Sequence, residues 1–89
     1  MYELTQVNPN NSVYFNQTQV LVFGSNIDSI FKAKVVQEQL TYLSGVTDIS
    51  VDLEDWERIL RVECSTETVS ELVVAKMLSM GFKCYELES

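Results

Sequence analysis

The chain has 89 residues, which suits one small domain, and 46% of them are hydrophobic, which is typical of a globular protein rather than a disordered one. Thirteen Asp and Glu residues against six Lys and Arg residues give a net charge of −7. A surface of this charge repels phosphate backbones and anionic lipid headgroups. The composition therefore predicts neither nucleic acid nor a membrane as a partner.

Several kinds of chemistry are missing from the sequence. It contains no His, which is the commonest general base and the commonest metal ligand. It has neither a Gly-rich phosphate-binding loop nor a nucleophile-elbow motif, so we expect no enzyme activity and no cofactor. No apolar run approaches the roughly 18 residues of a membrane span, and the first residues do not resemble a signal peptide. The sequence therefore predicts a cytoplasmic protein.

Residues 1–17 are predicted to be an extension ahead of the folded domain, which we place at residues 18–89. Apolar side chains within 2–4 and 13–15 flank a turn-forming stretch at 8–11, which reads NPNN. The extension is expected either to form a hairpin that lies on the sheet or to be a loose tail, since chain ends are often poorly ordered.

A strand is predicted over residues 19–25. Its run of four apolar, β-prone residues from Val20 to Phe23 indicates that both faces are covered. Gly24 permits a bend or the close approach of another part of the chain.

A helix is predicted from about residue 30 to Leu43. Either Asp28 or Ser29 is the expected N-cap, and Gly45 supplies the stop signal. Apolar residues at helical spacing predict one stripe that faces the core, namely Ile30, Ala33, Val36, Leu40 and Leu43.

The second half of the chain is predicted to form a hairpin, a helix and a closing strand. Residues 46–53 and 58–64 alternate between apolar and polar, which is typical of half-buried strands. An acidic connection between them contains Trp56. A helix up to about Met80 is followed by Gly81, a common helix-ending residue, and then by a short strand over 83–87.

The order β-α-β-β-α-β predicts an α+β fold, the ferredoxin-like sandwich, in which two helices cover one face of a four-stranded antiparallel sheet. Right-handed crossovers place three connections at one end of the sheet. Residues 26–29, 54–57 and 82–84 are therefore expected to be neighbours. Cys64 is expected at the opposite end, too far from Cys84 for a disulfide.

The face of the sheet without helices is predicted to carry Leu21, Phe23 and Ile59. Three large apolar side chains on one open face require cover. The expected cover is either the extension, through side chains such as Val13 and Phe15, or a second copy of the chain in a homodimer. These three residues are therefore candidates for an interaction surface.

The chain resembles the heavy-metal-associated (HMA) domain of copper chaperones and metal-transporting ATPases over about residues 19–88. The resemblance rests on Leu43-x-Gly45-Val46 leading into SVDL at 50–53, and on the late MGF at 80–82. In that family the loop after the first strand reads G-M-x-C-x-x-C. Counted back from Gly45, the family's methionine falls on Ile27.

The resemblance implies two metal-binding cysteines, but the same count places them at Ser29 and Lys32. Paired thiolates select Cu(I) and other soft metals, whereas a hydroxyl is a poor ligand and an ammonium repels a cation. No metal site is therefore expected there. The alternative is a replacement site that uses Cys84 and Asp28, or ligands from a partner protein.

The sequence is compatible with three functions. The first is a non-catalytic module that acts by protein–protein contact, with Trp56 either filling the sheet edge or exposed as an anchor for a partner. The second is a metal-binding or metal-transfer protein. The third is a regulatory domain of the ACT type, which shares the element order and binds small molecules at a Gly-containing loop after its first strand. In this chain Gly24 lies too many residues before the helix to fit such a loop well.

Overall fold

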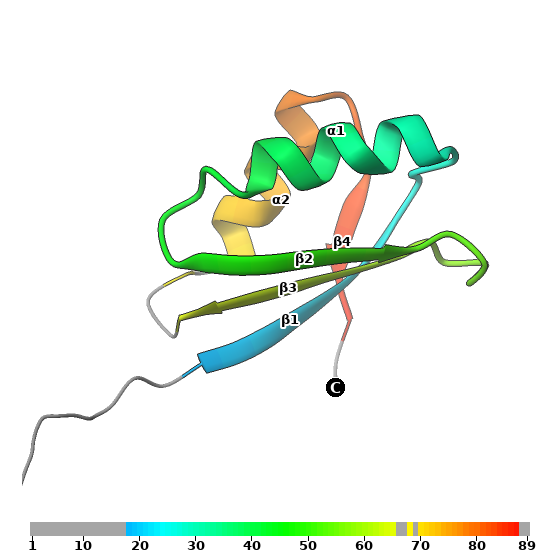
Figure 1. The fold of residues 1–89 in the computed structure, drawn as a ribbon. Helices are drawn as coiled ribbons and strands as arrows, with labels where there is room; N and C mark the ends of the chain where they lie inside the picture. Colours follow the sequence, from blue (N-terminus) through cyan, green and yellow to red (C-terminus); the bar gives the residue numbers. More distant parts are fainter. Residues whose placement is uncertain (1–17, 66–67, 69, 88–89) are drawn as a thin grey trace, which may run out of the picture.

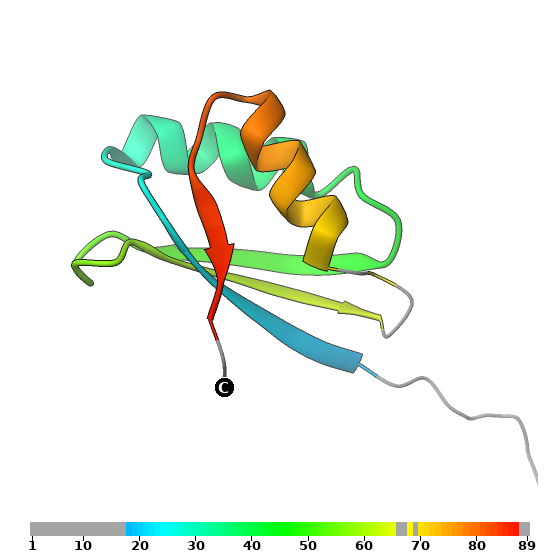
Figure 2. The ribbon, with the colours of Figure 1, turned by 180° about the vertical axis from the view of Figure 1, so that it is seen from behind.

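The computed structural model describes residues 18–65, 68 and 70–87, so predictions for residues 1–17 lie outside the described residues. The elements follow the predicted order: β1 (Thr18–Ser25), α1 (Ile30–Leu40), β2 (Val46–Asp52), β3 (Ile59–Ser65), α2 (Ser70–Ser79) and β4 (Cys84–Glu86). The strands form one antiparallel sheet in the order β2-β3-β1-β4, with both helices on the same face (Figures 1 and 2). The predicted ferredoxin-like fold is confirmed.

The core lies between the helices and the sheet. Helix α1 buries Ala33, Val36 and Leu40, and helix α2 buries Val73 and Met77. Most of the predicted stripe on α1 is therefore confirmed, although Ile30 at its start was assigned wrongly, since 68% of its surface is exposed.

Helix α1 ends three residues earlier than predicted. Thr41 is its C-cap, and the N–H of Leu43 bonds to the carbonyl of Leu40 in a turn. Gly45 then adopts a φ of +87°, a left-handed conformation that side chains disfavour. Gly45 therefore shapes the turn into β2, a few residues beyond the helix.

The assignment of Leu21 and Phe23 to the open face of the sheet was wrong. Leu21 pairs with Val62 and Phe23 with Leu60 across β1 and β3, and directly paired residues point to the same face. Leu60 and Val62 belong to the core beneath the helices. Phe23 is accordingly fully buried there, and Val20, on the opposite face, is 53% exposed. A continuous apolar run has no alternation from which to tell its two faces apart.

Ile59 does lie on the open face, as predicted, because it precedes the inward-facing Leu60. It is nevertheless only 6% exposed. Gly24 pairs with Tyr85 across β1 and β4, and a side-chain carbon on Gly24 would collide with the ring of Tyr85. The hydroxyl of Tyr85 donates to Oε2 of Glu57 at 3.0 Å, so the ring lies across this part of the sheet. We attribute the burial of Ile59 to Tyr85.

No helix within the described ranges combines the length and the apolar character needed to cross a bilayer.

Candidate functional site

Three connections meet at one end of the sheet, which we call the loop end: those from β1 to α1, from β2 to β3 and from α2 to β4. The N–H of Ser25 donates to the carbonyl of Glu57 at 2.9 Å, and its hydroxyl donates to the carbonyl of Arg58 at 2.7 Å. The N–H of Lys83 donates to Oδ1 of Asn26 at 2.8 Å. The predicted juxtaposition of these segments is therefore observed.

Ile27 anchors the loop between β1 and α1. Its side chain is fully buried in the core, and its N–H donates to the hydroxyl of Ser25 at 3.3 Å. Nη1 of the Arg58 guanidinium donates to the backbone carbonyl of Ile27 at 3.0 Å. Arg58 itself has a φ of +51°, unusual for a residue with a side chain. No pattern in the sequence identified Arg58, and Ile27 was matched to the family's methionine without a prediction that it anchors the loop.

Lys32 contacts both Ser29 and Asp28; Ser29 and Lys32 stand at the family's two cysteine positions. Ser29 is the N-cap of α1, and its hydroxyl accepts from the N–H of Lys32 at 3.1 Å, which satisfies a helix-end donor. The ammonium of Lys32 lies 2.9 Å from Oδ1 of Asp28. This hydrogen-bonded ion pair holds the pKa of Asp28 below its ordinary value.

These groups do not fit a soft metal cation. The hydroxyl of Ser29 is used by the helix end, and Lys32 brings a positive charge to the position of the second ligand. Across residues 18–65, 68 and 70–87, no three His, Cys, Asp or Glu side chains gather closely enough to hold a metal ion.

Cys84 lies at the loop end, as predicted, opposite Ser25 in the sheet. It is half-buried, and this burial raises the pKa of its thiol to about 11. Little thiolate, the form that binds metals, is present at neutral pH. Cys64 is buried at the far end, where it pairs with Gln19 and Val46, and both cysteines are free.

Trp56 is 87% exposed, so the interpretation that it fills the sheet edge is wrong. The connection that carries it is fixed by its own hydrogen bonds. The carboxylate of Asp55 accepts from the N–H of Glu57 at 2.9 Å, and the N–H of Arg58 donates to the carbonyl of Asp55 at 2.9 Å. These bonds form a compact turn that leaves the indole in solvent.

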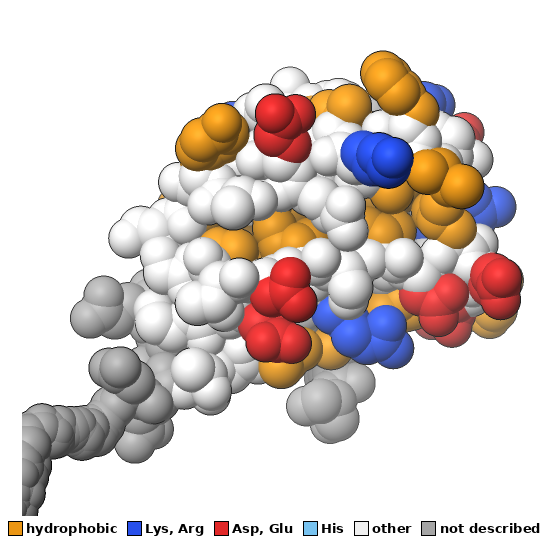
Figure 3. All heavy atoms as spheres, in the orientation of Figure 1, with side chains coloured by type: hydrophobic (Ala, Val, Ile, Leu, Met, Phe, Trp, Pro, Cys, Tyr) orange, Lys and Arg blue, Asp and Glu red, His pale blue; other side chains and the backbone are white. Residues whose placement is uncertain are grey.

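Trp56 borders a shallow, mostly polar hollow whose other walls are formed by Ser25, Asn26, Asp28 and Arg58. Acidic and basic side chains alternate with hydrophobic ones around the loop end, on the right of the space-filling view (Figure 3). The structure therefore brings Asp28, Ser29, Lys32, Trp56 and Cys84 to one end of the sheet. It does not bring Leu21, Phe23 or Ile59 into a surface that a partner could reach.

Gly24, considered above for an ACT-type loop, is a buried residue within β1. The ring of Tyr85 occupies the space where a side chain would be. The packing of Tyr85 on the open face thus explains why residue 24 is a glycine. The loop before α1, where an ACT-type site would lie, contains no glycine.

Neither a family model nor a curated protein matches the chain by sequence. Solved structures do match its fold. Oxidised MerP from Ralstonia metallidurans CH34 is 15% identical with a TM-score of 0.72, over 81% of this chain and 100% of that protein. The copper(I)-loaded first domain of the human copper chaperone for SOD1 is 23% identical with a TM-score of 0.66, over 79% and 93% of the two chains.

A putative copper-ion-binding protein from Bacillus anthracis strain Ames is 18% identical with a TM-score of 0.68, over 80% of this chain and 100% of that protein. The apo HMA domain of a copper chaperone for superoxide dismutase has the same identity and TM-score, over 99% and 86% of the two chains. The chain therefore has the fold of an HMA domain.

Proposed function

We propose that the chain is a small, non-catalytic binding module on an HMA-like scaffold, which acts in the cytoplasm by contact with another protein and carries no metal ion. One observation carries the proposal. The two loop positions expected to hold thiolates are occupied by a helix-capping hydroxyl, at Ser29, and by an ammonium paired with a carboxylate, at Lys32. Both groups are already engaged within the chain, so the loop is complete without a cation.

The contact surface of this proposal is the loop end around Trp56. A tryptophan that is 87% exposed is unusual outside interfaces, where tryptophan often contributes much of the binding energy. The hydrogen-bonded turn around it reduces the ordering that a partner would have to impose. Self-association, the other predicted form of contact, loses its main support, because Leu21 and Phe23 face the helices.

The rival function, metal binding through Cys84 and Asp28, has less support. The raised pKa of the Cys84 thiol, about 11, opposes formation of the thiolate. The carboxylate of Asp28 is held by Lys32. A site built from these two residues would need further ligands from a partner.

The proposal predicts that only the ligands, and not the scaffold, separate this chain from a Cu(I)-binding domain. The reduced protein should show no tight one-to-one binding when titrated with Cu(I) against a competing chelator. The double variant Ser29→Cys/Lys32→Cys should bind one Cu(I) tightly, because it places two thiolates on the same loop. Each single variant is the matched control and should bind far more weakly.

Tight binding by the unchanged chain would contradict the proposal. If that binding were lost in Cys84→Ser, the rival site would be supported; if it survived, unidentified ligands would be present.

The protein-contact part of the proposal is tested separately. The purified 89-residue chain is used to capture partners from an extract of its source cells, and the amounts captured are compared between Trp56→Ala and Tyr42→Ala. Tyr42 is a suitable control because it is 78% exposed and follows the opposite end of α1. A partner retained by the Tyr42 variant and lost by the Trp56 variant is expected. Equal capture by both variants would exclude Trp56 as the anchor.

A further inference from the structure

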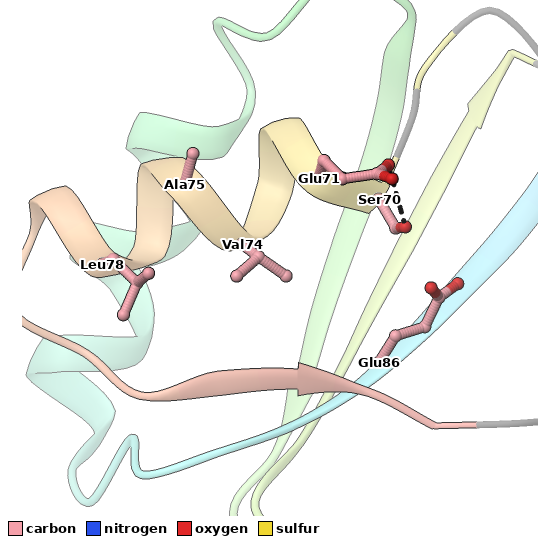
Figure 4. Close-up of a pocket in the computed structure, with 6 residues that line it drawn as sticks. All are labelled: Ser70, Glu71, Val74, Ala75, Leu78 and Glu86. Carbon is pink, nitrogen blue, oxygen red and sulfur yellow. Dashed lines mark hydrogen bonds between the residues drawn. The ribbon is translucent and has the colours of Figure 1, made fainter.

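A groove lies between helix α2 and strand β4. Its apolar part consists of Val74, Ala75 and Leu78 of α2, and Leu78 is 59% exposed. Figure 4 shows Val74 and Leu78 directed toward β4. Strand β4 is the last in the strand order, so the groove runs beside an edge of the sheet. Apolar side chains exposed beside a sheet edge form a surface that a partner can cover.

The end of the groove at the start of α2 is acidic. Glu71 lines it from the helix, and Glu86 points toward the start of the helix from β4 (Figure 4). Both side chains are exposed. Across the described part of the chain, no lysine or arginine forms a salt bridge with either glutamate. A positively charged group that enters this end would therefore meet two carboxylates.

The outer edge of β4 offers backbone hydrogen-bonding groups. On the inner edge, the N–H of Leu87 donates to the carbonyl of Val22 in β1 at 2.8 Å. Backbone groups of consecutive residues in a strand point to opposite sides, so those of Tyr85 also face β1. The N–H and carbonyl groups of Cys84 and Glu86 consequently face outward. An extended segment could pair with β4 at these two residues.

Side chains of such an added strand would alternate between the groove and the open face of the sheet. Directly paired residues of neighbouring strands point to the same face. Glu86 pairs with Phe23, which is buried beneath the helices, so Glu86 and Cys84 both lie on the helix face. Residues of an added strand opposite Glu86 and Cys84 would therefore point toward α2, and the residue between them would point away.

We propose that the groove binds an extended segment of another protein, which adds to β4 as an antiparallel strand. Helix α2 and strand β4 run in opposite directions, so Glu86 lies near the start of the helix and Cys84 near its end (Figure 4). The residue opposite Glu86 is a lysine or arginine that reaches the carboxylates of Glu86 and Glu71. The residue opposite Cys84 is apolar and covers Leu78. In an antiparallel strand the basic residue comes first, so the segment reads basic-any-apolar.

The spacing of these two residues agrees with the length of the groove. Alternate residues of a strand are roughly 6.6 Å apart. From Glu71 to Leu78 the helix rises about 10.5 Å at about 1.5 Å per residue. The difference of about 4 Å is shorter than an extended lysine or arginine side chain, whose apolar stem can lie along the groove. One basic and one apolar residue in alternate positions therefore reach both parts of the groove.

Charge favours a basic partner over a second copy of the chain as the occupant. A second copy would bring a net charge of −7 to a groove that holds Glu71 and Glu86. Residues 1–17 contain no Lys or Arg, so they lack the cation that the acidic end favours. Since an exposed ion pair adds little affinity, main-chain hydrogen bonds and the apolar contact supply most of the binding, and the carboxylates select the sequence.

Titration of the isotope-labelled 89-residue chain with synthetic peptides, followed by NMR, tests the proposal. The probe is the peptide TTKTLTT with both ends blocked, which should shift the signals of Val74, Leu78 and Glu86. The matched peptide TTETLTT should bind at least about fivefold more weakly, because its carboxylate meets two others. The indole signal of Trp56 should stay in place, so this test is separate from that of the loop end.

Variants of the chain separate a local contact from the effect of net charge. Glu86→Gln should reduce the preference for TTKTLTT over TTETLTT at least about twofold. Glu63→Gln is the matched control and should keep that preference, because it removes the same charge from an exposed residue of β3 on the open face. Leu78→Asp should weaken the binding of TTETLTT, whose leucine would meet a carboxylate in the groove.

The proposal is overturned if TTKTLTT leaves the signals of α2 and β4 unchanged, if both peptides bind equally, or if Glu63→Gln changes the preference as much as Glu86→Gln. A doubled mass in sedimentation, with signals of Leu78 and Glu86 that depend on protein concentration, would identify a second copy as the occupant and overturn it. Nuclear Overhauser contacts between Leu78 and residues 1–17 in the free chain would identify that segment as the occupant, with the same consequence.

Discussion

At the loop end, the connections are held by a buried isoleucine and by backbone carbonyls, and charged and aromatic side chains remain on the outside. At the opposite end, a buried side chain takes part in the contacts between connections. The hydroxyl of Thr68, which is 2% exposed, donates to the carbonyl of Ser44 at 2.8 Å, and the N–H of Ser65 donates to the carbonyl of Gly45 at 2.8 Å. Trp56 and Lys32 at the loop end have no counterpart among these contacts.

This difference indicates that the two ends differ in how much change they tolerate. The buried hydroxyl of Thr68 at the far end tolerates little change, because a buried donor without its acceptor costs free energy. Exposed groups at the loop end can be exchanged with small effects on folding. The exposed groups of the loop end should therefore accept substitution more readily than the buried group of the far end, and the following substitutions test that distinction.

The largest loss of stability at the loop end is expected from Ile27→Ala. Removing a fully buried isoleucine should lower the free energy of unfolding by roughly 2–5 kcal/mol, because a cavity is left in the core. Ile30→Ala is the control, since Ile30 is 68% exposed, and its effect should stay within about 0.5 kcal/mol. Denaturant titration measures both. Similar losses in the two variants would show that Ile27 does not anchor the loop.

At the far end, Gly45→Ala should lower the free energy of unfolding by roughly 2–4 kcal/mol. The left-handed backbone disfavours any side chain by about 1–2 kcal/mol, and the new carbon would also collide with the side chains of Ser65 and Thr68.

Gly81→Ala separates the two causes of that loss. Gly81 has a similar φ of +90°, but nothing lies within 4 Å of the place where its side-chain carbon would be. Only the backbone cost of about 1–2 kcal/mol should therefore appear in denaturant titration. Equal losses at Gly45 and Gly81 would mean that the far end is not tightly packed.

A smaller effect is expected from Ser29→Ala at the loop end. Loss of the N-cap should cost about 1 kcal/mol, because the N–H of Lys32 loses its acceptor within the chain. Ser29→Thr, which keeps a hydroxyl, should retain most of the stability. Thermal unfolding followed by circular dichroism compares the two, and an alanine variant as stable as the threonine variant would argue against the cap.

The smallest effect on stability is expected from Lys32→Met. Without the ammonium, the pKa of Asp28 should rise toward its ordinary value of 3.8, which an NMR titration of the carboxyl can follow. A carboxylate with a lowered pKa in the folded state contributes stability that is present above pH 3.8 and is lost as the pH falls through the folded value.

Because the ion pair is exposed, the melting temperature of Lys32→Met should differ little from that of the unchanged protein at neutral pH. The difference should be smaller still at high salt, which screens the pair. An unchanged pKa of Asp28 in Lys32→Met would show that the ion pair does not form in solution.

Much of the fold was predictable because its signals are local. Alternation marked the hairpin strands, Gly45 and Gly81 marked turns, and the spacing of Ala33, Val36 and Leu40 marked the buried side of α1. The faces of β1 were not predictable in the same way, because a run of four apolar residues looks the same from either side. Only pairing with Leu60 and Val62 decides which of them point inward.

The candidate site was predictable in its location but not in its contacts. Chain topology placed residues near 27, 56 and 84 at one end of the sheet, and they are found there. The exposure of Trp56 depends on hydrogen bonds within one short turn, and the ring of Tyr85, to which we attribute the burial of Ile59, is placed by its contacts with Glu57 and Gly24. Such contacts between side chains distant in sequence leave no periodic pattern.

The exposure of Trp56 has a practical consequence, since it is the only tryptophan in the chain. Its intrinsic fluorescence comes from an indole already in water when the protein is folded, so unfolding should change the emission little. A binding partner that covers the loop end would shift the emission to shorter wavelength and shield the indole from soluble quenchers. The unlabelled protein therefore carries its own optical reporter at the surface where contact is proposed.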